Sequence, residues 1–191
     1  MEKDLRTDEA LMLAYRHGDS TAFEALYLRW RGPLYRYFLR QSGHAGQADE
    51  LFQDVFMRVI GAAAGYEPTA RFSTWLFRIA HNRLIDHWRK SGREPVDPLD
   101  SGEEDMEREF DPPAAEGAAP DRQAEQRELG DALIAALNEL PEVQREAFLL
   151  AEEAGLTLEE IASISGVARE TLKSRLRYAM RKLRHRLESW R

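Results

Sequence analysis

Apolar residues recur at helical spacing through nearly the whole chain. In residues 47–60 they fall on one wide face, made of Ala48, Leu51, Phe52, Val55, Phe56 and Val59. No segment alternates β-branched with polar residues between turn residues, as a half-buried strand would. The pattern therefore predicts an all-α protein.

Capping residues divide the N-terminal part of this pattern into helices. One helix is expected between Thr7 and Gly18, because Thr7 precedes two acidic residues and glycine commonly ends a helix. A second opens at Asp19 or Ser20. Gly32-Pro33 is expected to interrupt it, because proline removes a backbone donor, and a third helix then follows.

The next segment combines a loop with a cationic and aromatic helix. Residues 61–72, "GAAAGYEPTARF", read as a loop, and Ser73 is expected to cap a helix that runs to about Lys90. The cations are Arg71, Arg78, Arg83, Arg89 and Lys90, and the aromatic residues are Phe72, Trp75, Phe77 and Trp88. Single-stranded nucleic acid is bound by this mixture of backbone charge and stacking surface. Helical spacing nevertheless assigns Leu76, Ile79 and at least one aromatic ring to packing.

Residues 93–121 differ in composition, being rich in Asp, Glu, Pro, Ala and Gly with few large apolar residues to bury. They are interpreted as an acidic flexible linker. The chain is therefore predicted to form two small helical domains, residues 1–92 and residues 122–191.

The C-terminal part shows the pattern of a helix-turn-helix. A helix near 122–139 is followed by Pro141 at a helix start and by Gly155 after a helix end. Thr157 begins a capping box that opens a short helix to about Ser163, and Gly166 makes the turn. Its small core is expected to contain Leu158, Ile161, Ala162, Ile164, Val167, Leu172 and Leu176.

The last helix of this pattern carries most of the C-terminal charge. Residues 166–187 hold eight Lys or Arg and one acid. The outward candidates are Arg169, Glu170, Thr171, Lys173, Ser174, Arg175, Arg177 and Tyr178. A lone basic helix could equally be a solvated face or a helix for a membrane surface or acidic partner. The capped helix and turn before it favour DNA.

Charge is strongly segregated in a chain whose net charge is −7. Residues 71–93 hold six Lys or Arg against one acid, residues 94–128 hold three against thirteen, and residues 129–166 hold one against eight. Basic blocks separated by acidic ones suggest two surfaces for a polyanion. The acidic linker is hypothesised to fold back on the basic blocks and suppress DNA binding in the free protein.

Other function classes find little support. There is no cysteine, which excludes disulfides and thiolate chemistry, and the five histidines show no metal-ligand spacing. No phosphate-binding loop is present, so neither an enzyme nor a cofactor is expected. No stretch approaches the roughly 18 apolar residues of a membrane span, and a cytoplasmic location without membrane insertion is expected.

Several stretches together resemble an extracytoplasmic-function (ECF) sigma factor of bacterial RNA polymerase. They are "GDSTAFEALYLRW", "ADELFQDVFMRVI", "FSTWLFRIAHNRLIDHWRK", "LPEVQREAFLLAEEAGLTLEEIASISGV" and "TLKSRLRYAMRKLRHRL", in the family's order. The resemblance implies that region two, at the N-terminus, binds the polymerase core and opens the −10 element. Region four, at the C-terminus, would read the −35 element. An anti-sigma factor is a possible further partner, and nucleotide polymerisation would belong to the polymerase.

The resemblance also implies site residues. The polymerase clamp coiled coil would contact Glu50, Gln53 and Asp54, which helical spacing puts on one side of their helix. The −10 element would contact Arg71, Trp75, Arg78, Asn82 and Arg83, and the loop 61–72 would receive a flipped base. The −35 element would contact Arg169, Glu170, Thr171, Lys173, Ser174, Arg175 and Arg177. Ala168 departs from the family's Ser or Thr at the helix N-cap.

The main alternative is a stand-alone helix-turn-helix activator or repressor. It would explain the C-terminal part but would leave the basic, aromatic helix 73–90 without a purpose. Direct duplex binding by the isolated protein would favour it.

Overall fold

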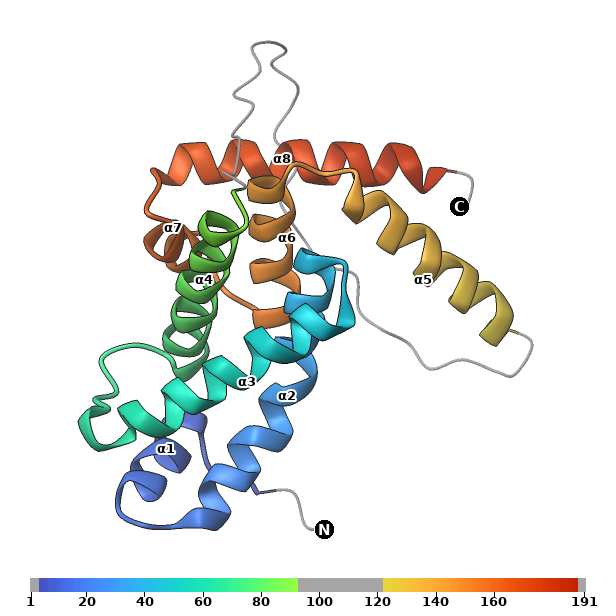
Figure 1. Ribbon diagram of the computed structural model, residues 1–191. Helices are drawn as coiled ribbons and strands as arrows, with labels where there is room; N and C mark the ends of the chain where they lie inside the picture. The colour runs from blue at the N-terminus through green and yellow to red at the C-terminus, as the bar shows by residue number, and fades with distance from the viewer. Residues whose placement is uncertain (1–3, 93–121, 189–191) are drawn as a thin grey trace.

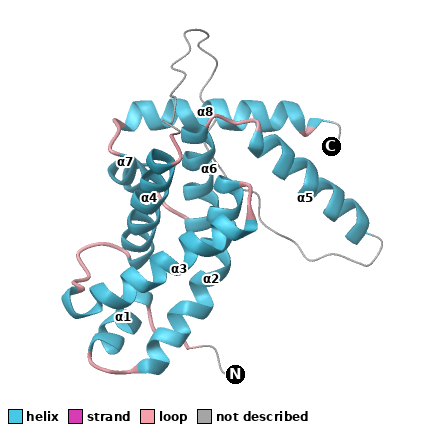
Figure 2. Ribbon diagram, in the orientation of Figure 1, coloured by secondary structure: helices cyan, strands magenta, loops and turns pink. Residues whose placement is uncertain are grey.

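The computed structural model describes residues 4–92 and 122–188, of residues 122–127 only the backbone, and helices joined by loops make up these ranges, without a strand (Figure 2). The N-terminal helices are α1 (Asp8–Arg16), α2 (Ser20–Ser42), α3 (Ala45–Ala62), the short 3-10 helix η1 (Ala63–Gly65) and α4 (Phe72–Lys90). The C-terminal helices are α5 (Arg122–Asn138), α6 (Glu142–Ala154), α7 (Leu158–Ser165) and α8 (Arg169–Arg186). The all-α prediction is confirmed. The linker hypothesis concerns residues 93–121, which lie outside the described residues.

The first two helices begin where their capping residues predict. The Thr7 side chain accepts from the backbone N–H of Ala10, and Asp19 accepts from Thr21 and Ala22. The expected break at Gly32-Pro33 is wrong, because α2 continues through Pro33 to Ser42. Proline costs a helix interior roughly 3 kcal/mol. Burial offsets this cost, since the face on either side of Pro33 is packed into the core through Leu26, Leu34, Tyr37 and Phe38.

The expected cap of α4 is also corrected. Helix α4 begins at Phe72, one residue before Ser73, and Ser73 is buried with a hydroxyl that has no partner among the described residues. The first turn is capped from elsewhere, because Glu9 of α1 accepts from the backbone N–H of Phe72 at 2.6 Å. Burial would raise the pKa of Glu9, but this bond and its other hydrogen bonds outweigh burial and lower that pKa.

The helix-turn-helix has the expected local structure. Thr157 and Glu160 form the capping box of α7, and the helix ends at Ser165, two residues later than predicted. Gly155 and Gly166 both end helices in the left-handed conformation, which glycine adopts at little cost. Ala168 precedes α8 in extended conformation and makes no side-chain cap bond.

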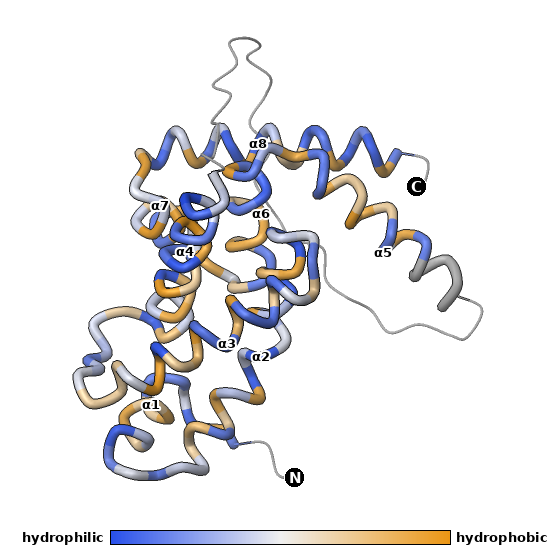
Figure 3. The backbone as a smooth tube through the Cα atoms, viewed as in Figure 1, coloured by the Kyte–Doolittle hydropathy of each residue, from blue (hydrophilic) through white to orange (hydrophobic). Residues whose placement is uncertain are grey.

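The two helical domains pack against each other. Helix α6 lies along α2 and α4, and α7 lies beside α4, while α8 crosses the end of α6 and α5 extends away (Figure 1). The buried apolar residues of both domains form one core cluster. The tube coloured by hydropathy is mostly hydrophilic along α8 (Figure 3). None of the helices in residues 4–92 and 122–188 has the length and apolar character needed to cross a membrane.

Candidate nucleic-acid and polymerase interfaces

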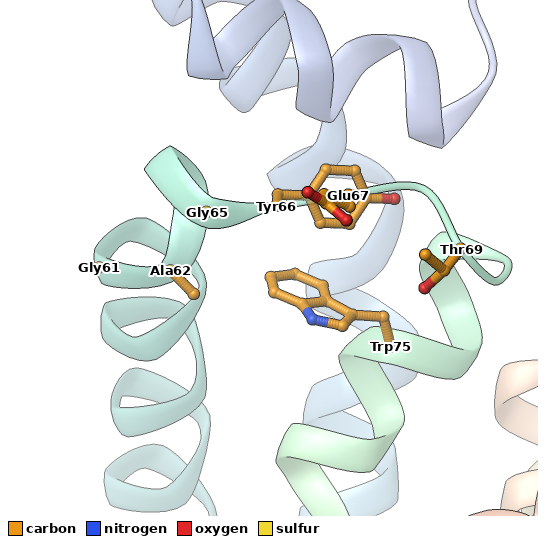
Figure 4. Close-up of a pocket in the computed structure, with 7 residues that line it drawn as sticks. All are labelled: Gly61, Ala62, Gly65, Tyr66, Glu67, Thr69 and Trp75. Carbon is orange, nitrogen blue, oxygen red and sulfur yellow. The ribbon is translucent and has the colours of Figure 1, made fainter.

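A pocket of about 520 Å³ lies between the end of α3 and the start of α4. It is lined by Gly61, Ala62, Gly65, Tyr66, Glu67, Thr69 and Trp75 (Figure 4). The loop that forms it was expected from sequence, and Trp75 was singled out. Tyr66, Glu67 and Thr69 were missed, although an aromatic residue inside a Gly- and Pro-containing loop was a usable indication.

The aromatic walls of the pocket are held in place by packing. The rings of Tyr66 and Trp75 are 5.0 Å apart at 70°, and Phe72 contacts both. Arg16 of α1 donates to the backbone carbonyl of Tyr66 at 2.9 Å, which ties the loop to the first helix. Burial, together with the carboxylates of Glu9 and Asp8, raises the pKa of Tyr66 to about 12. Tyr66 and Trp75 therefore form one packed aromatic wall of the pocket, of which the half-exposed indole is the accessible part.

Only part of the aromatic surface expected on α4 is accessible. Phe72, Phe77 and Trp88 are buried, so packing takes three of the four rings, and Trp75 alone remains half-exposed. Leu76 is buried and Ile79 packs against the core, as predicted. Among the polar candidates of this helix, Arg78 and Asn82 are exposed, and so is Arg71 at the N-cap. The exposed side of α4 is therefore mainly polar and cationic.

Arg83 lies apart from the other −10 candidates. It is 7% exposed, and its guanidinium pairs with Asp54 of α3 at 2.5 Å and with Glu50 at 3.9 Å. A buried arginine between two carboxylates holds α3 against α4 and does not face solvent. Its burial and its pairing with Asp54 do not support the expected DNA contact of Arg83. They indicate a role in packing α3 against α4.

The three polymerase candidates do share one side of α3. Glu50 and Gln53 are exposed, and Asp54 is half-buried beside Arg83. Met57 and Ile60, one to three turns further along this helix, are also exposed, at 66% and 39%. Neither residue was expected from the sequence as a contact. An acidic patch next to exposed apolar side chains is typical of a protein interface, whose apolar centre has a polar rim.

The exposed face of α8 carries the predicted cationic row. Arg169, Lys173 and Arg177 are all exposed and spaced by four, so they follow one side of the helix. Glu170 is exposed beside them, and Thr171, Ser174 and Arg175 are half-buried. Arg169 pairs with Glu159 of α7 at 2.7 Å, which braces the two helices of the motif.

The C-terminal end of α8 serves a different purpose. Lys182 donates to the backbone carbonyl of Glu139 at 2.5 Å, and Arg186 pairs with the Glu139 carboxylate at 2.6 Å. These two cations hold α8 to the segment that follows α5. Arg184 lies between them and is exposed. The described part of the chain contains no cluster of three or more residues that could hold a metal ion.

Comparison with known families matches both domains. The model of Sigma-70 region 2 matches residues 26–94, and that of Sigma-70 region 4 matches residues 130–183. The ECF RNA polymerase sigma factor RpoE of Cereibacter sphaeroides is 36% identical, over 97% of this chain and 98% of its own. The chain belongs to the ECF sigma factors.

Other relatives agree with this family. The ECF sigma factor SigE of Mycolicibacterium smegmatis is 34% identical over 79% of this chain, which spans 56% of that protein. The solved structure of the sigma factor RpoE of Bartonella quintana, in complex with the anti-sigma factor NepR, has a TM-score of 0.64 and 28% identity. It covers 88% of this chain and 98% of that chain.

Family membership establishes the function at the level of the whole chain. This sigma factor binds RNA polymerase and promoter DNA and directs promoter-specific initiation of transcription. The resemblance found in the sequence is thereby confirmed. A stand-alone helix-turn-helix regulator is excluded as the class, because region 2 accounts for the helices that such a regulator would leave unexplained.

Proposed function

We propose that the two domains divide promoter reading between them, with residues 1–92 binding the polymerase core and the −10 element and residues 122–191 reading the −35 element. The pocket beside α4 carries this proposal. Its aromatic wall, formed by Tyr66 and Trp75, lies beside the start of α4, where Arg71 and Arg78 are exposed. A base extruded from a duplex needs an aromatic face to stack on, and its backbone needs cations nearby. Asn82, exposed on the same helix, offers an amide donor and acceptor for a base edge.

The test of this role is promoter opening by the reconstituted holoenzyme. The chain is added to sigma-free core polymerase, and start sites on a genomic library are mapped to define its promoters. On one such promoter, Trp75→Ala should remove a stacking contact worth roughly 1–3 kcal/mol and reduce open complexes accordingly. Arg31→Ala, at an exposed arginine of α2, is the matched control for changes of surface charge when Arg78→Ala is tested. If neither Trp75→Ala nor Arg78→Ala reduces the amount of open complex on this promoter, the assignment is contradicted.

The proposed core-binding surface is the side of α3 that carries Glu50, Gln53 and Asp54. Its acids suit basic residues of the polymerase clamp coiled coil, and charge complementarity of this kind speeds association. Because Asp54 holds Arg83 at 2.5 Å and Glu50 approaches it only at 3.9 Å, the sharper test replaces Glu50 and Gln53 by Lys and leaves Asp54 in place. Core affinity should fall with helicity unchanged. Glu24→Lys, exposed on α2, makes a similar charge change elsewhere, and equal affinity for all these variants would refute the surface.

The proposed −35 surface is the start of α8. Losing Arg169, Lys173 or Arg177 should each cost about 1–3 kcal/mol and relax preference at one base pair. Arg184→Ala, further along the helix, should weaken all sequences alike and reduce the salt slope by about one. Binding of the holoenzyme to variant −35 elements over a salt series separates these outcomes. If no variant changes sequence preference, α8 is only a cationic anchor.

Two further assignments follow from the family. A sigma subunit works with the chromosome and polymerase, so we place the chain in the cytoplasm, without catalysis of its own. The Bartonella quintana relative was solved with an anti-sigma factor, and an anti-sigma partner is proposed for this chain as well. Copurification of the chain with cell proteins in the absence of core, followed by inhibition of transcription by the recovered protein, tests it.

A further inference from the structure

Helix α1 holds both ends of the pocket loop, residues 66–71, which joins η1 to α4. Its Arg16 donates to the backbone carbonyl of Tyr66 at 2.9 Å, where the loop begins. Its Glu9 accepts from the backbone N–H of Phe72 at 2.6 Å, directly after the loop. Glu9 and Arg16 are seven residues apart, so two helical turns place them on one face of α1. That face of α1 therefore contacts the pocket loop at its start and at its end.

The pocket loop makes local backbone bonds of its own. Tyr66 donates to Ala63 at 3.2 Å, and Thr69 donates to Glu67 at 2.8 Å. The N-cap of α4, Arg71, makes no side-chain cap bond. Local bonds hold a turn together but do not fix it relative to the rest of a fold. The bonds from α1 therefore tie the backbone at both ends of the loop to a separate element.

Helix α1 is firmly anchored, so it can serve as a fixed support. Its Leu11 and Met12 are fully buried in the core. Its Asp8 accepts from Arg29 at 2.6 Å and from the indole N–H of Trp30 at 2.9 Å, and both partners belong to α2. The pocket loop is thus fixed relative to α2 through α1.

The two residues that α1 holds support the aromatic wall of the pocket. Tyr66 and Phe72 are buried, and their ring centroids lie 5.0 and 5.7 Å from that of Trp75. Tyr66 and Trp75 also line the pocket itself (Figure 4). A binding site keeps its specificity only while its side chains are held within about 0.5 Å of one geometry. A displaced loop would therefore change the surface that the pocket offers to a base.

We propose that Arg16 and Glu9 are positioning residues of the −10 pocket, and that α1 thereby sets how well the pocket distinguishes one extruded base from another. This inference rests on the proposed role of the pocket in reading the −10 element. Helix α1 precedes the segment that matches Sigma-70 region 2, which begins at residue 26. The proposal thus extends the unit that reads the −10 element to a helix outside that segment.

The competing role for Arg16 is a phosphate contact, because the residue is exposed. The two roles predict different results. Loss of a phosphate contact weakens binding to all sequences alike and lowers the salt slope by about one. Loss of a positioning residue relaxes base preference at one position and leaves the salt slope unchanged, since no contact with the DNA backbone is removed.

The first measurement is hydrogen exchange at the amides of residues 66–72 in the full chain. Arg16→Met removes the donor and keeps an apolar stem, and Glu9→Ala removes the acceptor. Each should speed exchange about fivefold, the factor that corresponds to one hydrogen bond of about 1 kcal/mol. Arg16→Lys keeps a long donor and should restore slow exchange. The matched controls are Arg31→Met and Glu24→Ala at exposed positions of α2, and they should exchange like the parent chain.

The second measurement is promoter opening by the holoenzyme on single-base variants of the −10 element. The position to follow is the one at which Trp75→Ala relaxes base preference. Arg16→Met should reduce open complexes about fivefold on the preferred base and less on the other three, with core affinity and salt slope unchanged. Arg16→Lys should restore the preference. In a chain that already carries Trp75→Ala, Arg16→Met should have little further effect, because both changes act on one pocket.

Three results would overturn the inference while Trp75→Ala still impairs opening. They are unchanged loop exchange in Arg16→Met and Glu9→Ala, unchanged base preference in both, and an equal loss on all bases with a lower salt slope in Arg16→Met. Failure of the proposed −10 role looks different. In that case Trp75→Ala leaves promoter opening intact, and variants with faster loop exchange open the promoter like the parent chain. Circular dichroism verifies that every variant keeps its helices.

Discussion

The missing cap at the start of α8 can be supplied by one substitution. Ala168 has φ −63° and ψ 148°, close to the values of Thr157 (−73°, 163°) and Thr7 (−67°, 158°). Both threonines accept from the backbone N–H three residues later, at 3.3 and 3.2 Å. Because Ala168 is exposed, a Thr there has room and can accept from Thr171 in the same way. Ala168→Thr should therefore satisfy one unpaired donor of the helix start.

The expected gain is about 1 kcal/mol, within a range of about 0.5–2 kcal/mol for such caps. Ala168→Val is the matched control, because valine has the shape of threonine without the acceptor. Thermal unfolding measures the difference. If the C-terminal domain melts alone, 1 kcal/mol corresponds to about 4–8 °C, and if both domains melt together, to about 2–4 °C. The size of the shift thus also reports how strongly the packing of α6 and α7 on α2 and α4 couples the domains.

A second assay connects this cap to function. The first turn of α8 holds Arg169 and Glu170, so ordering it in advance should improve −35 binding by the holoenzyme, by at most about fivefold for 1 kcal/mol. Equal melting temperatures for Ala168→Thr and Ala168→Val would refute the reasoning. It would mean that the first turn of α8 is already ordered, with its backbone N–H groups bound to water and its start held by the pairing of Arg169 with Glu159.

Other outcomes follow from the same structure. Glu9→Gln should weaken the cap of α4 by about 1 kcal/mol at pH 7. The lowered pKa of Glu9 adds stability above the unfolded pKa of about 4.3, which is lost as pH falls through the folded pKa, so the variant's deficit in urea unfolding should shrink toward pH 3. Pro33→Ala should restore a backbone bond in α2 and raise the free energy of unfolding by about 1–3 kcal/mol. A value below that of the parent would show that α2 needs its proline. Arg83→Met should lower the free energy of unfolding by only about 1 kcal/mol, because the Asp54 carboxylate that loses its partner is 43% exposed and can be hydrated. A more stable variant would show that this pair does not hold α3 against α4.

Sequence alone determined the features that depend on neighbours along the chain. Capping residues placed the starts of α1, α2 and α7, and glycines placed the ends of α6 and α7, because these bonds join residues three or four positions apart. The apolar face of α3 followed from helical spacing, and Ala48, Leu51 and Val55 are indeed buried. The exposed row on α8 followed for the same reason.

The tertiary structure decided whatever depends on residues far apart in the chain. Local rules predict a helix break at Pro33 and a helix cap at Ser73. In the structure, core packing keeps α2 helical through Pro33. Helix α4 is capped by Glu9, which lies 63 residues before Phe72. Arg83 has the sequence context of a DNA contact, but α3 brings Asp54 to it. The docking of Glu146 on Tyr37 spans 109 residues. No periodicity encodes such a pairing, because it arises only when two separately formed helical surfaces of complementary charge meet.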